Sequence, residues 1–220
     1  MTDLPDLIGP EAEPASGGPA KQLILFVHGY GADGNDLISL AQYFAHVAPD
    51  AAFFSPNAPY RCDGSPYGYQ WYDVWMQDRD ERLGAIRSTA AIFDNFIDQQ
   101  LDRRGLTEKS LVLIGFSQGT MMSLFTAPRR EKAVSGIVGY SGRMEAPNLL
   151  KDEIKSKPPV VLIHGDSDEL LAVSEMETAA AALKECGVGI DTHVRPGLGH
   201  GIDEQGIRIG LEFVKNALGS

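Results

Sequence analysis

The segment from residue 111 to residue 120 most constrains what this 220-residue chain can fold into. It reads Leu-Val-Leu-Ile-Gly-Phe-Ser-Gln-Gly-Thr, so an apolar run leads directly into Gly115-x-Ser117-x-Gly119. A buried strand that turns sharply into a helix at a serine is typical of a nucleophile elbow, where the serine holds a strained backbone conformation. The two glycines leave room for chain that passes close to the turn. The segment therefore predicts a strand, a reactive Ser117 and a helix.

The same turn predicts part of an oxyanion hole. The backbone N–H of Gln118 would point from the helix N-terminus at the oxygen of a carbonyl that Ser117 attacks. A second donor is expected from the glycine-dense loop at 28–34, which follows an apolar run at 23–27. Tyr30 N–H is the natural candidate there. The alternative is that these glycines only make a tight connection between a strand and a helix.

A serine nucleophile needs a base and an acid, and both follow in the order that α/β-hydrolases use, acid before histidine. The apolar run at 160–164 opens into a loop that carries Asp168. A later strand, at 190–194, is followed by a loop that carries His200. Loops at the carboxyl ends of parallel strands share one edge of the sheet. We therefore expect Ser117, Asp168 and His200 to form a catalytic triad.

Asp166 competes with Asp168 for the role of acid because the two share one loop. Asp168 lies farther past the strand end and can reach toward His200. Asp166 is better placed to cap the turn by accepting hydrogen bonds from backbone N–H groups. We expect Asp168 to be the acid.

The choice of base is among five histidines. Four of them are expected to be structural, since they end apolar runs or lie inside a helical stretch or a strand. These four are His28, His164, His46 and His193. His200, between Gly199 and Gly201, is free to move over the serine and is the predicted base.

Strands and helices alternate along the chain. We expect strands near residues 22–28, 51–55, 109–115, 133–139, 159–164 and 189–194, and helices near 36–47, 83–103, 118–127, 174–186 and 203–218. Strands that are apolar on both faces indicate a mostly parallel central sheet with helices on each side, which is an α/β fold. With 43% hydrophobic residues, the chain is long enough for one core and small for two, so residues 1–220 are expected to form one domain.

Charge and cysteine content exclude several classes of function. The formal net charge of −11 opposes binding to nucleic acid or to an anionic membrane surface, because phosphate contacts need clustered cations. The two cysteines, Cys62 and Cys186, suggest neither a metal site nor a disulfide framework, which favours a cytoplasmic location. Residues 1–20 have no basic start and no apolar core, so we expect a loose arm that could add an edge strand, and no stable membrane insertion.

Six motifs in order give the chain a resemblance to the phospholipase/carboxylesterase family of the α/β-hydrolase superfamily, which includes bacterial carboxylesterases and acyl-protein thioesterases. The resemblance spans nearly the whole chain. It rests on Phe26-Val-His28-Gly-Tyr-Gly31, Pro56-Asn-Ala-Pro59, Gly115-Phe-Ser117-Gln-Gly119, Tyr140-Ser-Gly142, His164-Gly-Asp-Ser-Asp168 and Gly199-His200-Gly201.

The resemblance implies an α/β-hydrolase fold and a serine esterase or thioesterase without metal or cofactor, with Ser117, Asp168 and His200 in the triad positions. It also implies Tyr30 and Gln118 in the oxyanion positions, and it makes a homodimer an expectation. Members similar to this chain often carry proline after the acid, where Glu169 stands here.

The segment from residue 60 to residue 81 is longer and more aromatic than in the shortest family members, with Tyr67, Trp71 and Trp75 among its residues. Trp71 could form a wall of the substrate pocket, and Leu170, which follows the acid, could line the acyl site. The alternative is that the aromatic residues of this segment form a hydrophobic cluster that only holds a long loop in place.

Three functions are consistent with the sequence. The first is a carboxylesterase that acts on small esters with short to medium acyl chains. The second is an acyl-protein thioesterase or a lysophospholipase. The third, from another class, is a ligand receptor without catalytic activity on a hydrolase scaffold. The complete set of Ser117, Asp168 and His200 argues against the receptor.

Overall fold

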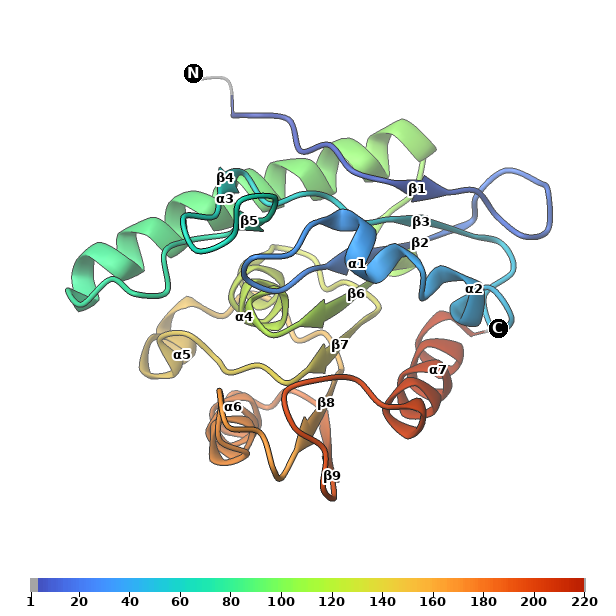
Figure 1. Cartoon of the computed structure of the whole chain (residues 1–220). Helices are drawn as coiled ribbons and strands as arrows, with labels where there is room; N and C mark the ends of the chain where they lie inside the picture. The colour runs from blue at the N-terminus through green and yellow to red at the C-terminus, as the bar shows by residue number, and fades with distance from the viewer. Residues whose placement is uncertain (1–3, 220) are drawn as a thin grey trace.

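A seven-stranded sheet forms the centre of the molecule in the computed structural model, which describes residues 4–219 (Figure 1). Its strands follow the order β1-β3-β2-β6-β7-β8-β9 across the sheet. The strands are β1 (Glu11–Ala12), β2 (Gln22–Val27), β3 (Ala51–Phe54), β6 (Leu111–Phe116), β7 (Gly136–Tyr140), β8 (Val160–Gly165) and β9 (Ile190–Arg195).

Six of these strands pair in parallel, and only β1 runs antiparallel, beside β3. Every residue of β3 and β7 is buried, and β2, β6 and β8 are buried over most or all of their length. Strands covered on both faces are typical of parallel sheets in α/β proteins. The predicted α/β-hydrolase architecture, a mostly parallel sheet with helices on both faces, is confirmed.

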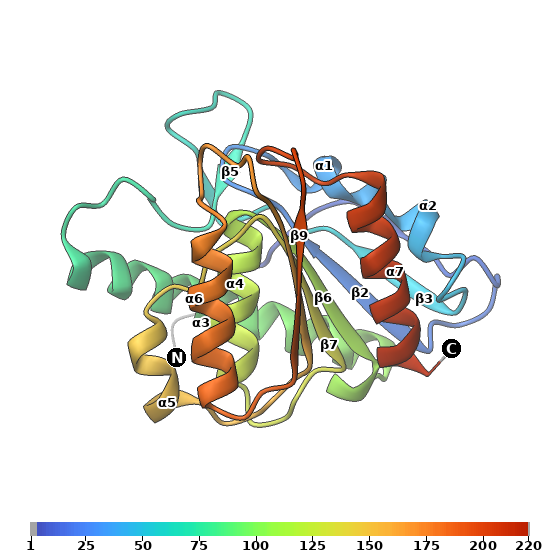
Figure 2. The ribbon, with the colours of Figure 1, turned by 90° about the horizontal axis from the view of Figure 1, so that it is seen from below.

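Helices cover both faces of the sheet, as Figure 2 shows. α3, α4 and α6 pack on one face over a core that includes Leu25 and Leu113, and α1, α2 and α7 pack on the other over a core that includes Ile24 and Phe26. The helices are α1 (Gly34–Ile38), α2 (Ala41–Phe44), α3 (Arg79–Arg104), α4 (Gln118–Thr126), α5 (Leu150–Glu153), α6 (Ser174–Glu185) and α7 (Glu204–Leu218). Single 3-10 turns lie at Glu108–Ser110, Ala127–Arg129 and Pro147–Leu149.

The longest helix, α3, has clear sequence signals at both ends. Asp78 caps its N-terminus by accepting hydrogen bonds from the backbone N–H groups of Asp80 and Glu81, both at 2.9 Å. Gly105 ends it in the left-handed conformation, with φ +63°. The helix begins four residues before the expected range and ends one residue after it.

Two parts of the fold differ from the sequence expectation. The helix expected near 36–47 is split into α1 and α2, because the N–H groups of Leu40 and Tyr43 bond to carbonyls three residues earlier and not four. A small antiparallel hairpin, β4 (Tyr60–Arg61) with β5 (Tyr69–Gln70), was not expected. Its strands are two residues long, too short for a clear alternation of apolar and polar residues.

The N-terminal arm runs along the edge of the sheet. Leu7 is buried at 6% exposure, and the carbonyls of Ile8 and Pro10 accept hydrogen bonds from the backbone of Asn57 and Ser55. β1 then pairs with β3. From residue 7 to residue 12 the arm is therefore held against the sheet by backbone hydrogen bonds and one apolar side chain.

Candidate active site

Ser117 lies at the turn between β6 and α4, at the carboxyl edge of the sheet. Its backbone has φ +52° and ψ −117°, a region that residues with side chains rarely occupy and that stores strain. The turn is held by a hydrogen bond from Ser117 N–H to the carbonyl oxygen of Tyr140, at 2.9 Å. The strained turn is therefore fixed by the neighbouring strand β7.

The two glycines of the motif are required by close packing. A Cβ atom on Gly119 would lie 1.8 Å from the carbonyl oxygen of Val27, and one on Gly115 would lie 2.5 Å from the backbone nitrogen of Thr120. Neither contact leaves space for a side chain. These glycines let α4 lie directly against β2 and let the turn at Ser117 close.

His200 and Asp168 come together from two loops that are 32 residues apart in sequence. His200 Nδ1 lies 2.8 Å from Asp168 Oδ2. An ionised carboxylate only accepts hydrogen bonds, so Nδ1 carries the proton and Nε2 presents its lone pair. The His200 side chain is 17% exposed and that of Asp168 is 0% exposed. This pair is thus a candidate base and acid with the required tautomer.

The carboxylate of Asp168 accepts hydrogen bonds from three donors, and a second imidazole lies beside it. Oδ1 accepts hydrogen bonds from the backbone N–H groups of Leu170 and Leu171, both at 2.9 Å, and Oδ2 faces His200 and His164. Burial would raise the pKa of Asp168, but the Leu171, His200 and Leu170 donors outweigh it and hold the pKa below its usual value. Asp168 is therefore kept ionised.

Asp166 has a different environment. Its Oδ1 accepts a hydrogen bond from the backbone N–H of Gly197, at 2.7 Å, and another from the Ser167 hydroxyl, at 3.0 Å. Gly197 belongs to the loop that carries His200. Asp166 thus joins the acid loop to the histidine loop, whereas Asp168 contacts the imidazole itself.

The His200 ring packs against Phe116, the residue before Ser117, with 5.0 Å between ring centroids. Within residues 4–219, no hydrogen bond joins Ser117 to His200. In enzymes without substrate, the contact between nucleophile and base is often long and shortens only when substrate binds. The contact between Phe116 and His200 places the elbow and the His200 loop next to each other at the carboxyl edge of the sheet.

The His200 loop is fixed at its base and near its tip. Arg195, at the end of β9, pairs with Asp203, the N-cap of α7, with 3.0 Å between Nη2 and Oδ2. This pairing lowers the pKa of Asp203. Ser141 donates a hydrogen bond to the carbonyl oxygen of Gly201 at 3.2 Å, from a backbone at φ +45°.

The loop after β2 carries the second candidate oxyanion donor. His28 is fully buried: its Nε2 accepts a hydrogen bond from Ala58 N–H, at 3.0 Å, and its Nδ1 lies 2.8 Å from the Gly29 carbonyl oxygen. Burial lowers the pKa of His28, so the ring is neutral. No hydrogen bond in the described part of the chain uses Tyr30 N–H, and Gln118 N–H lies in the first turn of α4.

The side chain of Gln118 has a structural role in addition to the candidate oxyanion role of its backbone N–H. Its Oε1 accepts a hydrogen bond from Trp71 N–H at 2.9 Å, and its Nε2 donates to the Tyr72 carbonyl oxygen at 2.7 Å. The amide therefore joins the start of α4 to the aromatic segment. The hairpin also pairs with the Tyr30 loop, because Tyr69 accepts from Gly31 N–H at 2.9 Å. Both candidate oxyanion loops are held by this segment.

The structure corrects the prediction that Trp71 lines the substrate pocket. Its side chain is 0% exposed, its indole N–H donates to the His28 carbonyl oxygen at 3.0 Å, and its ring packs edge-on against Phe93. A ligand has no surface of Trp71 to contact. The large flat ring was a reasonable candidate for a pocket wall, but it packs in the core between β2 and α3.

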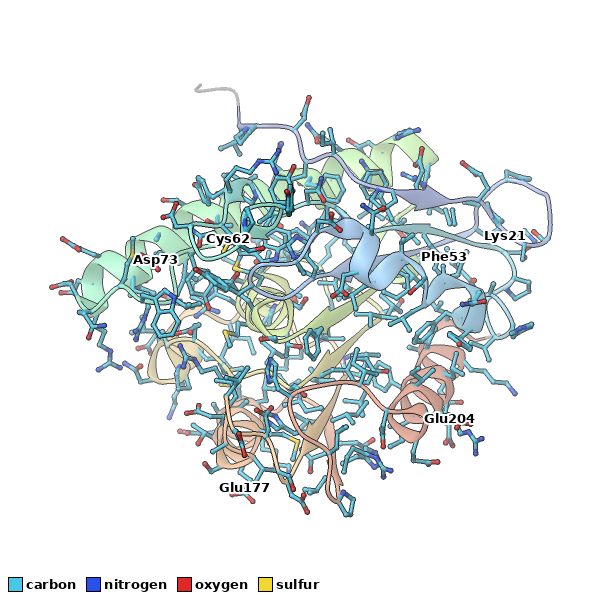
Figure 3. All side chains as sticks on the ribbon, in the orientation of Figure 1. Lys21, Phe53, Cys62, Asp73, Glu177 and Glu204 are labelled. Carbon is cyan, nitrogen blue, oxygen red and sulfur yellow. The ribbon has the colours of Figure 1, made fainter. Side chains whose placement is uncertain are left out.

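Leu170, by contrast, is on the surface beside the acid and is 75% exposed. Trp75 and Tyr67 are also exposed, at 71% and 84%. The segment that carries them lies at one end of the molecule, where Cys62 and Asp73 are labelled in Figure 3. The Cys62 thiol lies against the Tyr30 hydroxyl and raises the pKa of that phenol.

Several of these supporting contacts could not be found from the sequence motifs. The motif Gly-x-Ser-x-Gly leaves the residue after the serine open, so nothing in it indicates that the Gln118 side chain holds Trp71 and Tyr72. Asp203 does have a signal, since an aspartate just before a helical pattern is a common N-cap. Its partner Arg195 is evident only in three dimensions.

No group of three or more His, Cys, Asp or Glu side chains that could hold a metal ion is found among residues 4–219. Over the same residues, every helix is too short or too polar to span a bilayer.

Comparison with known proteins identifies relatives over most of the chain. A family model described as phospholipase/carboxylesterase matches residues 12–218. The esterase YpfH of Escherichia coli (strain K12) is 26% identical over 197 residues, covering 90% of this chain and 83% of that protein. Acyl-protein thioesterase 1 of Saccharomyces cerevisiae is 31% identical over 169 residues, covering 70% of this chain and 74% of that protein.

Among solved structures, the crystal structure of esterase PE8 is similar to this one with a TM-score of 0.91 and 39% sequence identity. The similarity covers 97% of this chain and 100% of that chain. The relatives are thus esterases and acyl-protein thioesterases.

Proposed function

Because this chain belongs to the phospholipase/carboxylesterase family and is an esterase or thioesterase, we propose that it is a serine carboxylesterase that hydrolyses small esters with short to medium acyl chains. Ser117 is the nucleophile, His200 the base and Asp168 the acid. Because its relatives are an esterase and acyl-protein thioesterases, the comparisons do not support a ligand receptor without catalytic activity.

The observation that carries the proposal is the hydrogen bond between His200 Nδ1 and Asp168 Oδ2, at 2.8 Å, beside a strained serine at the start of α4. This bond leaves Nε2 of His200 as the free lone pair that a general base needs. In a nucleophile elbow, a backbone conformation of this kind exposes the serine hydroxyl at the carboxyl edge of the sheet.

Catalysis then proceeds in two halves. In the first, Ser117 Oγ attacks the ester carbonyl while its proton passes to His200 Nε2, and the negative oxygen accepts hydrogen bonds from Tyr30 N–H and Gln118 N–H. His200 gives the proton to the leaving alcohol, and an acyl-enzyme remains. In the second half, His200 removes a proton from water, which attacks the acyl-enzyme; His200 then returns that proton to Ser117 Oγ as the bond to the acyl group breaks, and the acid is released.

An acyl-protein thioesterase is the second candidate, and the 31% identity to the yeast enzyme favours it. The exposed side chains of Leu170, Trp75 and Tyr67 are consistent with a longer acyl chain or a peptide at the rim of the site. The chemistry is the same for both candidates, since a thiolate replaces the alkoxide as leaving group.

Hydrolysis of p-nitrophenyl esters from acetate to palmitate, measured for the wild type and Ser117→Ala, tests the proposal. We expect kcat/KM to be highest for short chains and Ser117→Ala to reduce kcat by about 10⁴- to 10⁶-fold, because triad members act as a unit. A fluorophosphonate should label the wild type and not the variant. Ser110→Ala, at the opposite end of β6, is the matched control and should retain wild-type rates.

The outcomes separate the two candidates. A preference for long chains, together with faster turnover of acyl-cysteine peptides than of matched esters, would favour the thioesterase. Wild-type turnover by Ser117→Ala would refute the assignment of the nucleophile for either substrate class.

A further inference from the structure

His164, at the end of β8, has no part in the mechanism above, yet it contacts the acid. Its side chain is 1% exposed. Its Nε2 lies 2.8 Å from the carbonyl oxygen of Leu171 and 3.2 Å from Asp168 Oδ2. One buried ring atom therefore faces two oxygen acceptors.

The hydrogen-bond partners determine which nitrogen of His164 carries the proton. A carbonyl oxygen only accepts, so Nε2 carries the hydrogen that it donates to Leu171, and the same N–H lies beside Asp168 Oδ2. The other nitrogen, Nδ1, is buried and has no partner among the described residues. Nε2 is therefore the nitrogen through which this ring acts on the acid loop.

The contacts of His164 close a ring of polar contacts around the acid loop. Leu171 donates its N–H to Asp168 Oδ1 at 2.9 Å and accepts from His164 through its carbonyl oxygen. Asp168 Oδ2 faces His164 on one side and His200 on the other. Rotation of the carboxylate would break these contacts together, and rotation about this bond is otherwise loosely restrained for aspartate.

We propose that His164 is a positioning residue that holds the Asp168 carboxylate so that Oδ2 points at His200 Nδ1. This inference rests on the proposed function, in which Asp168 and His200 form the acid and base of the triad.

Three substitutions at His164 test whether the Nε2–H donor and its position matter for catalysis. His164→Leu removes the donor, and we expect kcat to fall by about 10- to 100-fold at an unchanged KM, since a misplaced catalytic group costs rate without weakening substrate binding. His164→Gln keeps an N–H near the position of Nε2. His164→Asn has a side chain one carbon shorter, so its amide N–H does not reach that position. We expect Gln to restore most of kcat and Asn to restore little of it.

A double-mutant cycle with Asp168→Asn decides whether His164 acts through the acid. If it does, His164→Leu should change kcat by less than about twofold in the Asp168→Asn background, because the interaction is already lost. An equal loss in both backgrounds would mean that His164 acts elsewhere, and would overturn the inference. Wild-type kcat in His164→Leu would overturn it as well.

The controls keep this inference apart from the proposed function. His193→Leu, on the neighbouring strand β9 and away from the acid, should retain wild-type kcat. If His164→Leu does not fold, the comparison of Gln with Asn still decides, and equal rates in those two variants would refute the role of the donor. Near wild-type activity of Asp168→Asn would refute the triad itself, whereas an inactive Asp168→Asn with an unaffected His164→Leu would refute only this inference.

Discussion

Two aspartates in one loop show how environment assigns roles to identical side chains. Asp168 is fully buried at its side chain and contacts His200, while Asp166 bonds the backbone of Gly197. We expect Asp168→Asn to lower kcat by about 10⁴-fold, because an amide in place of the carboxylate favours the wrong imidazole tautomer. Asp166→Asn should lower it far less. Steady-state kinetics on one ester measures both.

One outcome of this comparison would contradict the assignment of Asp168 as the acid. An active Asp168→Asn beside an inactive Asp166→Asn would transfer the role of acid to Asp166. Circular dichroism of both variants shows whether a loss of activity comes with a loss of fold.

The aromatic segment with the β4–β5 hairpin is the element that supports the candidate oxyanion hole. Gln118 holds its backbone at Trp71 and Tyr72, Thr89 donates to the Trp71 carbonyl oxygen at 2.7 Å, and β5 bonds to Gly31. The two loops that carry Tyr30 and Gln118 are thereby connected through one segment that belongs to neither. Of the two sequence alternatives for this segment, the packing of Trp71 supports the cluster that holds a loop in place.

The two tryptophans of this segment should therefore respond differently to truncation. We expect Trp71→Ala to lower the free energy of unfolding by about 3–5 kcal/mol, since it empties a site in the core. Trp75→Ala, at an exposed position, should change it by less than about 0.5 kcal/mol. Urea unfolding followed by circular dichroism measures both. Similar losses in the two variants would contradict the packing described for Trp71.

At the scale of the whole molecule, stability should depend on pH through His28. Burial lowers the pKa of His28 in the folded protein, so the unfolded chain binds a proton at higher pH than the folded one. The stability from the neutral ring is complete above the unfolded pKa, about 6.5. It is lost as the pH falls from there through the lower folded pKa.

Urea unfolding at pH 8 and at pH 5 tests this dependence. The wild type should lose more free energy of unfolding between these two pH values than His28→Asn, which cannot take up the proton. His193→Asn, in a partly exposed position on β9, serves as the matched control and should follow the wild type. Equal losses in the wild type and in His28→Asn would exclude His28 as a source of the pH dependence.

Much of the fold was predictable from local sequence alone. The five apolar runs at β2, β3, β6, β7 and β8 indicated buried strands, and Asp78 with Gly105 could mark the ends of α3. These features are local, because burial, caps and turns depend on residues close together in the chain. The hairpin and the divided helix at α1 and α2 were missed because their segments are too short to show a periodicity.

For the candidate site, the sequence determined the types and the order of the residues: Ser117 in its elbow, then an aspartate in the loop after β8, then His200. Only the tertiary structure decided which aspartate meets the histidine, that Trp71 is in the core, and that His164 and the Gln118 side chain support the site. The physical reason is that a nucleophile elbow is specified by neighbouring residues, whereas a hydrogen bond between loops 32 residues apart depends on how the strands beneath them pack.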